Sequence, residues 1–123
     1  MIKSILLVGV GGSIGSIIRF LCQKWIYQLH PHPFPWGTFL VNITGCFLIG
    51  MFWNIVTRSS TGNDDLRLLL MTGFCGGFTT FSAFTFESIG LLKEQRLGLF
   101  FLYITASVIV GLLATFAGMR LIK

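Results

Sequence analysis

Charged residues are scarce in this chain of 123 residues, and acids are the scarcest of them. Only 11% of the residues are charged, with four Asp or Glu against nine Lys or Arg. Soluble domains carry roughly 25% charged residues, so this chain lacks the polar surface that a water-facing globule needs. With 54% hydrophobic residues and a mean hydropathy of +0.83, the composition predicts an integral membrane protein.

Motifs that would indicate other functions are missing. The three cysteines, Cys22, Cys46 and Cys75, have no zinc or redox spacing, and we interpret them as small packing residues. His30 and His32 have no acid or thiol nearby in the sequence, and the glycine-rich stretch lacks the lysine of a phosphate loop. We therefore expect no enzyme. The basic residues are scattered, so no nucleic-acid partner is expected either.

The chain has room for four apolar helices, since each needs about 20 residues to span a bilayer. All three prolines fall within residues 30–35, which predicts a non-helical linker. Because no small-x-small cleavage site follows a short apolar core, we expect the first helix to be uncleaved. The composition thus predicts an all-α membrane protein with one domain. The predicted spans are residues 4–27, 36–57, 66–92 and 98–122, separated by residues 30–35, 58–65 and 93–96.

The third predicted span differs from a plain membrane anchor. Gly76-Gly77 followed by Thr79-Thr80 favours a break of this helix in mid-membrane. Irregular backbone at membrane depth is tolerated only where it is buried in protein or lines a cavity. Broken helices with freed carbonyls are one way in which membrane proteins hold small ions. This stretch therefore predicts a small membrane protein that handles ions.

Neutral hydrogen-bonding side chains recur along one face of the second and the fourth spans. Asn42 in mid-membrane requires partners, and the sequence allows either a neighbouring helix or a passing ligand. Together with Ser82, such neutral donors suit a small, strongly hydrated anion, because they replace water without trapping the ion by a full charge. The two stripes are Thr38, Asn42, Cys46 and Gly50, and Tyr103, Ser107, Gly111 and Thr115.

Four further residues each allow a structural and a functional interpretation. Phe81 and Phe84 share a helical face, and they either pack in the core or turn their positive ring edges toward an anion. Arg19 follows the close-packing motif of residues 11–15, and it either snorkels to the membrane surface or draws anions into a vestibule. Glu87 is the only acid inside a predicted span, and it is either a cation or proton site or a solvated group in an aqueous mouth.

The basic residues give little bias between the two sides of the membrane. Since the positive-inside rule works on such differences, the chain could insert in both orientations and pair with an antiparallel copy. A single orientation with a modest bias is the alternative. One side would carry Lys3, Arg58, Arg67, Arg120 and Lys123, and the other Lys24, Lys93 and Arg96, with Arg19 added if it reaches that surface.

Three blocks of the sequence closely resemble the CrcB family of fluoride channels, also called Fluc. The resemblance covers nearly the whole chain, and its third block is the most specific. The chain departs from the family pattern at Ala83, where Thr is usual, with Thr85 as the nearest following hydroxyl, and at Gly111, where a serine is frequent. The blocks are residues 11–19 (GGSIGSIIR), 37–50 (GTFLVNITGCFLIG) and 73–84 (GFCGGFTTFSAF).

The resemblance implies a dual-topology antiparallel homodimer surrounded by lipid in a bacterial inner membrane. Such a dimer would hold two fluoride pathways and would export fluoride passively, relieving its toxicity. The resemblance also implies a structural sodium ion on the two-fold axis, held by the backbone carbonyls of Gly76 and Thr79. The implied pathway residues are Asn42, Phe81, Ser82, Phe84, Tyr103 and Ser107, with Arg19 in the vestibule and Glu87 near the pore mouth.

Two other classes of protein are considered. A small multidrug-type antiporter also has four spans and dual topology, but it needs an acid in the first span, and this span has none. A structural subunit could recruit partners through its glycine faces. That alternative would leave the combination of Asn42, Ser82 and the two phenylalanines unexplained.

Overall fold

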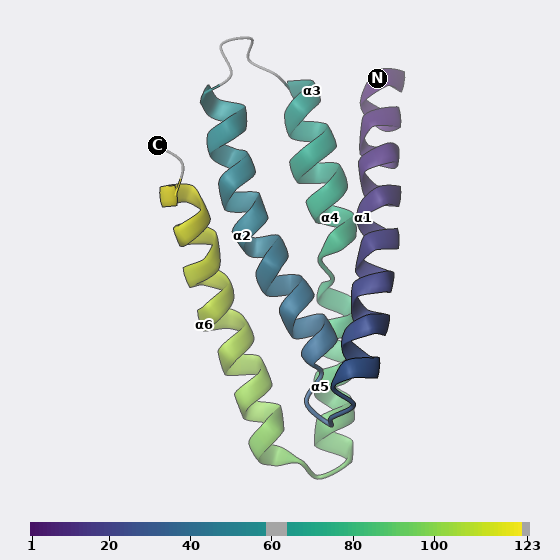
Figure 1. Cartoon of the computed structure of the whole chain (residues 1–123), viewed down its shortest axis with the longest axis vertical. Helices are drawn as coiled ribbons and strands as arrows, with labels where there is room; N and C mark the ends of the chain where they lie inside the picture. Colours follow the sequence, from purple (N-terminus) through teal and green to yellow (C-terminus); the bar gives the residue numbers. More distant parts are fainter. Residues whose placement is uncertain (59–63, 122–123) are drawn as a thin grey trace.

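The structure is a computed structural model that describes residues 1–58 and 64–121. All elements in the described residues are helical, and the long helices pack side by side in a bundle (Figure 1). The N-terminus, the end of α2 and the start of α3 lie at one end of the bundle, and the α1–α2 and α5–α6 connections lie at the other. The elements are α1 (Ile2–Leu29), α2 (Trp36–Arg58), α3 (Asp64–Arg67), the π-helical η1 (Leu68–Cys75), α4 (Gly76–Phe78), α5 (Phe81–Lys93) and α6 (Leu97–Leu121).

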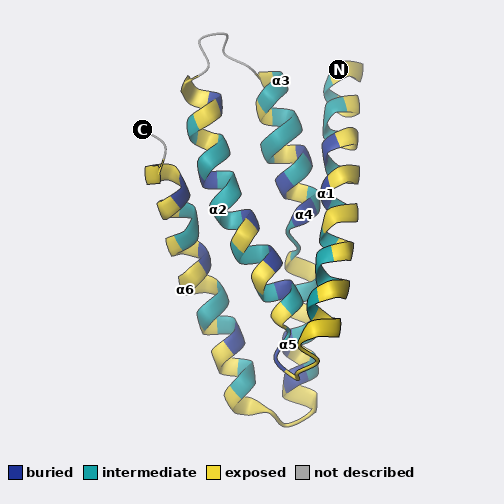
Figure 2. Cartoon of the chain, in the orientation of Figure 1, coloured by how far each residue is buried: buried dark blue, intermediate teal, exposed yellow. Residues whose placement is uncertain are grey.

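Within the described residues, four helical stretches are long and apolar enough to cross a membrane. They are Ile2–Leu29, Trp36–Arg58, Asp64–Lys93 and Leu97–Leu121. The first three contain the corresponding predicted spans, whereas most of the predicted second linker (residues 59–63) and the end of the fourth span at Ile122 lie outside the described residues. Many large apolar residues are exposed, as lipid contact requires, and Figure 2 shows exposed positions along each of the long helices. The chain is therefore a multi-pass membrane protein.

Glycines bring α1 into backbone contact with the third span. A Cβ on Gly15 would lie 2.9 Å from the backbone nitrogen of Phe78, and a Cβ on Gly77 would lie 2.9 Å from the Cα of Gly12. Side chains at these positions would push the two helices apart. The close-packing motif of residues 11–15 therefore has a partner within the chain.

A second glycine contact joins α2 to α6. A Cβ on Gly50 would lie 2.9 Å from the backbone nitrogen of Met119, and a Cβ on Gly118 would lie 3.0 Å from that of Met51. Gly111 faces the side chain of Cys46, whose Sγ would lie 3.5 Å from an added Cβ. The bundle thus consists of two tightly packed helix pairs, α1 with the first half of the third span and α2 with α6.

Two threonines interrupt the helical backbone of the third span. Thr79 (φ −90°, ψ 157°) and Thr80 (φ −149°, ψ 118°) have extended backbone between α4 and α5, while Gly76 is still helical (φ −62°, ψ −38°). The Thr80 hydroxyl accepts a hydrogen bond from the Ala83 N–H at 3.2 Å and so caps α5. The extended residues therefore lie just after the glycine pair rather than at it.

Gly15→Ala tests the importance of the glycine contact between α1 and the third span. We expect it to destabilise the protein by about 1–3 kcal/mol, because the added methyl group meets backbone atoms that cannot rotate away. The thermal unfolding midpoint in detergent measures this change. Gly90→Ala on α5 is the matched control, because its methyl group would have no neighbour within 4 Å. Equal midpoints for the two variants would contradict the close approach of α1.

Candidate functional site

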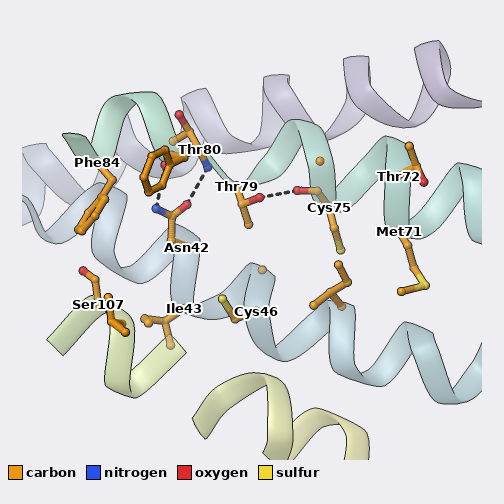
Figure 3. Close-up of a pocket in the computed structure, with 15 residues that line it drawn as sticks. Asn42, Ile43, Cys46, Met71, Thr72, Cys75, Thr79, Thr80, Phe84 and Ser107 are labelled. Carbon is orange, nitrogen blue, oxygen red and sulfur yellow. Dashed lines mark hydrogen bonds between the residues drawn. The ribbon is translucent and has the colours of Figure 1, made fainter. Parts of the chain in front are cut away.

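A cavity of about 430 Å³ lies between α2, the third span and α6. Figure 3 shows its lining, which combines neutral polar groups with aromatic and aliphatic side chains. No residue of the lining carries a charge. Six of the predicted site residues meet here, namely Asn42, Gly76, Thr79, Phe81, Phe84 and Ser107.

Asn42 binds the extended segment of the third span through both ends of its amide. Its Nδ2 donates to the carbonyl oxygen of Thr80 at 3.0 Å, and its Oδ1 accepts from the Thr80 N–H at 2.8 Å (Figure 3). The side chain thereby takes the place of helical hydrogen-bond partners that Thr80 has lost. Because an amide nitrogen carries two hydrogens, one N–H of Asn42 still has no acceptor among the described residues and remains available in the cavity lining.

The other backbone groups freed around Thr79 and Thr80 divide into satisfied and unsatisfied ones. The Gly77 carbonyl accepts from Arg19 Nε at 3.1 Å and from Ser16 Oγ at 3.5 Å. The N–H and the hydroxyl of Thr79 turn back to the Cys75 carbonyl at 3.0 and 2.8 Å.

The carbonyls of Gly76 and Thr79 have no hydrogen-bond donor in the described part of the chain, and both residues line the cavity. No group of three His, Cys, Asp or Glu able to hold a metal occurs in that part either. Unpaired carbonyl oxygens are ligands for hard cations such as sodium. A cation at this site would therefore be bound by neutral oxygens, and these two carbonyls are candidates.

The Ser107 hydroxyl lies on the opposite wall of the cavity, on α6. Within residues 1–58 and 64–121, it is the buried side-chain polar atom without a hydrogen-bond partner. A buried polar group without a partner costs free energy. Such a group facing a cavity indicates a binding partner that the protein chain itself does not supply.

Aromatic rings extend from this cavity toward the α5–α6 end of the bundle. The ring centroids of Phe81 and Phe84 are 5.9 Å apart, and those of Phe84 and Tyr103 are 5.0 Å apart. Phe84 is partly buried against the cluster of Phe34, Leu91 and Tyr103. Phe81 is different, because 76% of it is exposed in the single chain.

Glu87 and Tyr103 form a separate polar network beside the cavity. The Tyr103 and Thr38 hydroxyls donate to the two carboxylate oxygens of Glu87 at 3.0 and 2.9 Å. Gln23 Nε2 donates to the Thr38 hydroxyl at 2.9 Å, so each of the four spans contributes one residue. Gln23, Thr38 and Glu87 also line a second cavity of about 470 Å³ under the α1–α2 linker, which is where a solvated carboxylate would lie.

Four of the predicted site residues lie outside the first cavity, among them Tyr103, whose hydroxyl donates to Glu87. Arg19 contacts the third span from the α1 side, and Glu87 belongs to the polar network described above. Ser82 is exposed, and its hydroxyl lies 3.4 Å from that of Thr80. Thr85, the hydroxyl nearest to the departure at Ala83, donates to the Ser82 carbonyl of its own helix at 3.0 Å.

Sequence reasoning assigned no site role to Gln23, Thr38 or Thr80. Thr38 carried a detectable signal, because it lies one turn before Asn42 on the same stripe. The sequence distinguished Gln23 only as a polar residue within an apolar span. Thr80 was singled out only as part of the predicted break, and it acts mainly through its backbone.

Comparison with known proteins defines the class to which this fold and site belong. Residues 6–119 match the family described as "CrcB-like protein, Camphor Resistance (CrcB)". This match covers most of the chain, and the chain belongs to that family, as its three sequence blocks predicted.

Individual relatives match over nearly their whole length. The chain is 49% identical to the fluoride-specific ion channel FluC of Phocaeicola vulgatus, over 94% of this chain and 95% of that protein. It is 48% identical to the FluC of Rhizobium etli (96% and 94%) and 41% identical to that of Flavobacterium psychrophilum (98% and 98%). Since the relatives are named as ion channels, the prediction that the chain is not an enzyme is confirmed.

Asn42→Leu tests whether this amide holds the extended segment in place. We expect a loss of about 1–3 kcal/mol in stability, because the N–H and the carbonyl of Thr80 would both lose their partners in an apolar environment. Hydrogen exchange at the Thr80 amide should also become faster. Thr57→Val on the same helix is the control, since its hydroxyl bonds only carbonyls of α2. Unchanged exchange at Thr80 would rule out this function of Asn42.

Proposed function

We propose that this chain is a fluoride-specific ion channel that lets fluoride leave the cell down its gradient and so relieves fluoride toxicity. The near full-length match to relatives named as fluoride-specific ion channels carries the proposal. The uncharged lining of the first cavity supports it. Neutral donors replace the water around a small anion without binding it so tightly that it cannot leave.

The proposed path begins at two donors that the described chain leaves unused. The second N–H of Asn42 and the Ser107 hydroxyl would bind the ion in the cavity, and Phe81 and Phe84 would present positive ring edges to it. Ser82 and Tyr103 would extend the path on the two sides of the phenylalanines. Tyr103 and Phe84 are already in ring contact, which supports this order.

We further propose that a structural sodium ion binds the carbonyls of Gly76 and Thr79 at a mid-membrane break of the third span. Two observations support this site, the extended backbone of Thr79 and Thr80 and the absence of donors to those two carbonyls in the described residues. When bound, the ion would supply the positive charge that the exposed carbonyl oxygens need in a low-dielectric environment. Asn42 and Thr80 hold the backbone that presents these oxygens.

A second, antiparallel copy completes the proposal. Two copies would place four carbonyls around one sodium ion and would create two fluoride pathways. Each copy would be a single multi-pass domain in the bacterial inner membrane. The exposure of Phe81 beside the cavity supports a partner on this face, because an ion path bordered by this ring must be shielded from lipid by protein. Arg19 would lie in the vestibule and Glu87 near the pore mouth.

Fluoride efflux from liposomes tests the proposed activity. We expect purified protein to release fluoride rapidly and to retain chloride, as followed with ion-selective electrodes. Phe81→Ile should abolish the fluoride signal because it removes the ring edge from the path. Phe101→Ile is the control, since it changes an exposed ring on α6 away from the cavity. Folded protein that releases no fluoride would overturn the proposal.

Ser107→Ala separates binding in the path from structural support. The hydroxyl is buried and has no partner in the described chain, so its removal should not destabilise the protein. Fluoride efflux should nevertheless fall about tenfold, the effect of one lost hydrogen bond of roughly 1.4 kcal/mol. Ser88→Ala, whose hydroxyl bonds its own helix at 2.7 Å, should leave efflux unchanged. Normal efflux in Ser107→Ala would place the path elsewhere.

A further inference from the structure

One face of α1 packs against the last helical turn before Thr79. Gly12, Ser16 and Arg19 are spaced by four and three residues, so they lie on the same side of the helix. Gly12 brings this face into backbone contact with Gly77. One and two turns further along, Ser16 Oγ and Arg19 Nε both point to the Gly77 carbonyl, at 3.5 and 3.1 Å.

Arg19 makes this contact instead of an ion pair. In the described part of the chain, the ion pairs are Lys3–Asp65, Arg67–Asp64 and Arg96–Glu94, and Arg19 takes part in none of them. A guanidinium that donates to a carbonyl forms a charge-assisted hydrogen bond, which is stronger than one between neutral groups. Its acceptor is a carbonyl that would otherwise lack its helical donor, because the helix stops at Phe78.

The Gly77 carbonyl contacts α1, whereas the neighbouring residues Gly76 and Thr79 face the cavity. Gly77 itself does not line the cavity. Successive carbonyls along a helical turn emerge on different sides of its axis. A fixed direction for the Gly77 carbonyl therefore also fixes the rotation of the turn that presents the Gly76 carbonyl to the cavity.

We propose that Arg19 is a positioning residue for the cation site. Its Nε–H anchors the Gly77 carbonyl on α1, and this contact holds the carbonyls of Gly76 and Thr79 in the direction in which they bind sodium. The inference rests on the sodium site of the proposed function. In this proposal the function of Arg19 depends on the hydrogen bond that its Nε donates. A vestibule arginine would instead act through its charge.

Three substitutions separate the hydrogen bond from the charge. In Arg19→Gln, the amide nitrogen is attached to Cδ, as Nε is in arginine, so the variant keeps a donor at that position and loses the charge. Arg19→Met has a methyl group at the equivalent position and loses both properties. Arg19→Lys keeps the charge but has a methylene group there. Arg120→Gln removes a cation that lies over the Phe116 ring on α6, and it controls for net charge.

The measurement is the sodium dissociation constant of the full-length protein. It is obtained from the rise of the unfolding temperature with sodium concentration, with choline as the replacing cation. We expect Arg19→Gln and Arg120→Gln to keep the constant of the unchanged protein. Arg19→Met and Arg19→Lys should raise it about tenfold, as expected for the loss of one hydrogen bond.

The outcomes distinguish failure of this inference from failure of the site on which it rests. A constant that is normal in Arg19→Lys but raised in Arg19→Gln would show that charge matters, and would overturn the positioning function. An unchanged constant in Arg19→Met, with an unfolding temperature lowered equally with and without sodium, would leave only a structural function and overturn it as well. No sodium response in the unchanged protein would overturn the cation site itself, and fluoride efflux from the same preparation would test the channel separately.

Discussion

The structure depends on one constraint, namely that backbone groups freed inside a membrane must find partners within the protein. The extended Thr79 and Thr80 remove several helical hydrogen bonds from the third span. Asn42 from α2 restores two of them, and Arg19 and Ser16 from α1 satisfy a third group. Two neighbouring helices are thus tied to the same short segment, and the segment is fixed although it is not helical.

Close packing of glycines makes this arrangement possible. Side chains on α1 reach the Gly77 carbonyl because Gly12 and Gly15 let the helix backbones touch. On the other side, Gly50 and Gly118 join α2 and α6 into a second pair. The cavity lies between the two pairs, and its lining includes the larger side chains of Ile43, Met71 and Phe84. The tight contacts thus lie within each pair, and the open space lies between the pairs.

The sequence predicted the spans and the family well, and the partners within the site poorly. Hydrophobic length and the proline linker are local signals, and they were sufficient to place the four helices. The need of Asn42 for a partner was also predictable, but its identity was not, because Thr80 is recognised through its backbone. The same applies to Arg19, whose partner is a carbonyl. For Glu87, the partners Thr38 and Tyr103 come from other helices, and their meeting depends on helix rotation, which periodicity does not determine.

The distribution of charge around the cavity bears directly on how an anion could pass. Arg19 is bound to the Gly77 carbonyl on the α1 side, and Glu87 accepts hydrogen bonds from two hydroxyls under the α1–α2 linker. Neither group belongs to the lining of the first cavity. A guanidinium in that lining would bind a small anion more tightly than a neutral donor does, and a carboxylate would repel it. Hydrogen bonds hold both side chains outside the lining, so an ion on the proposed path would meet the neutral donors of Asn42 and Ser107 instead, and their modest strength would favour transient binding.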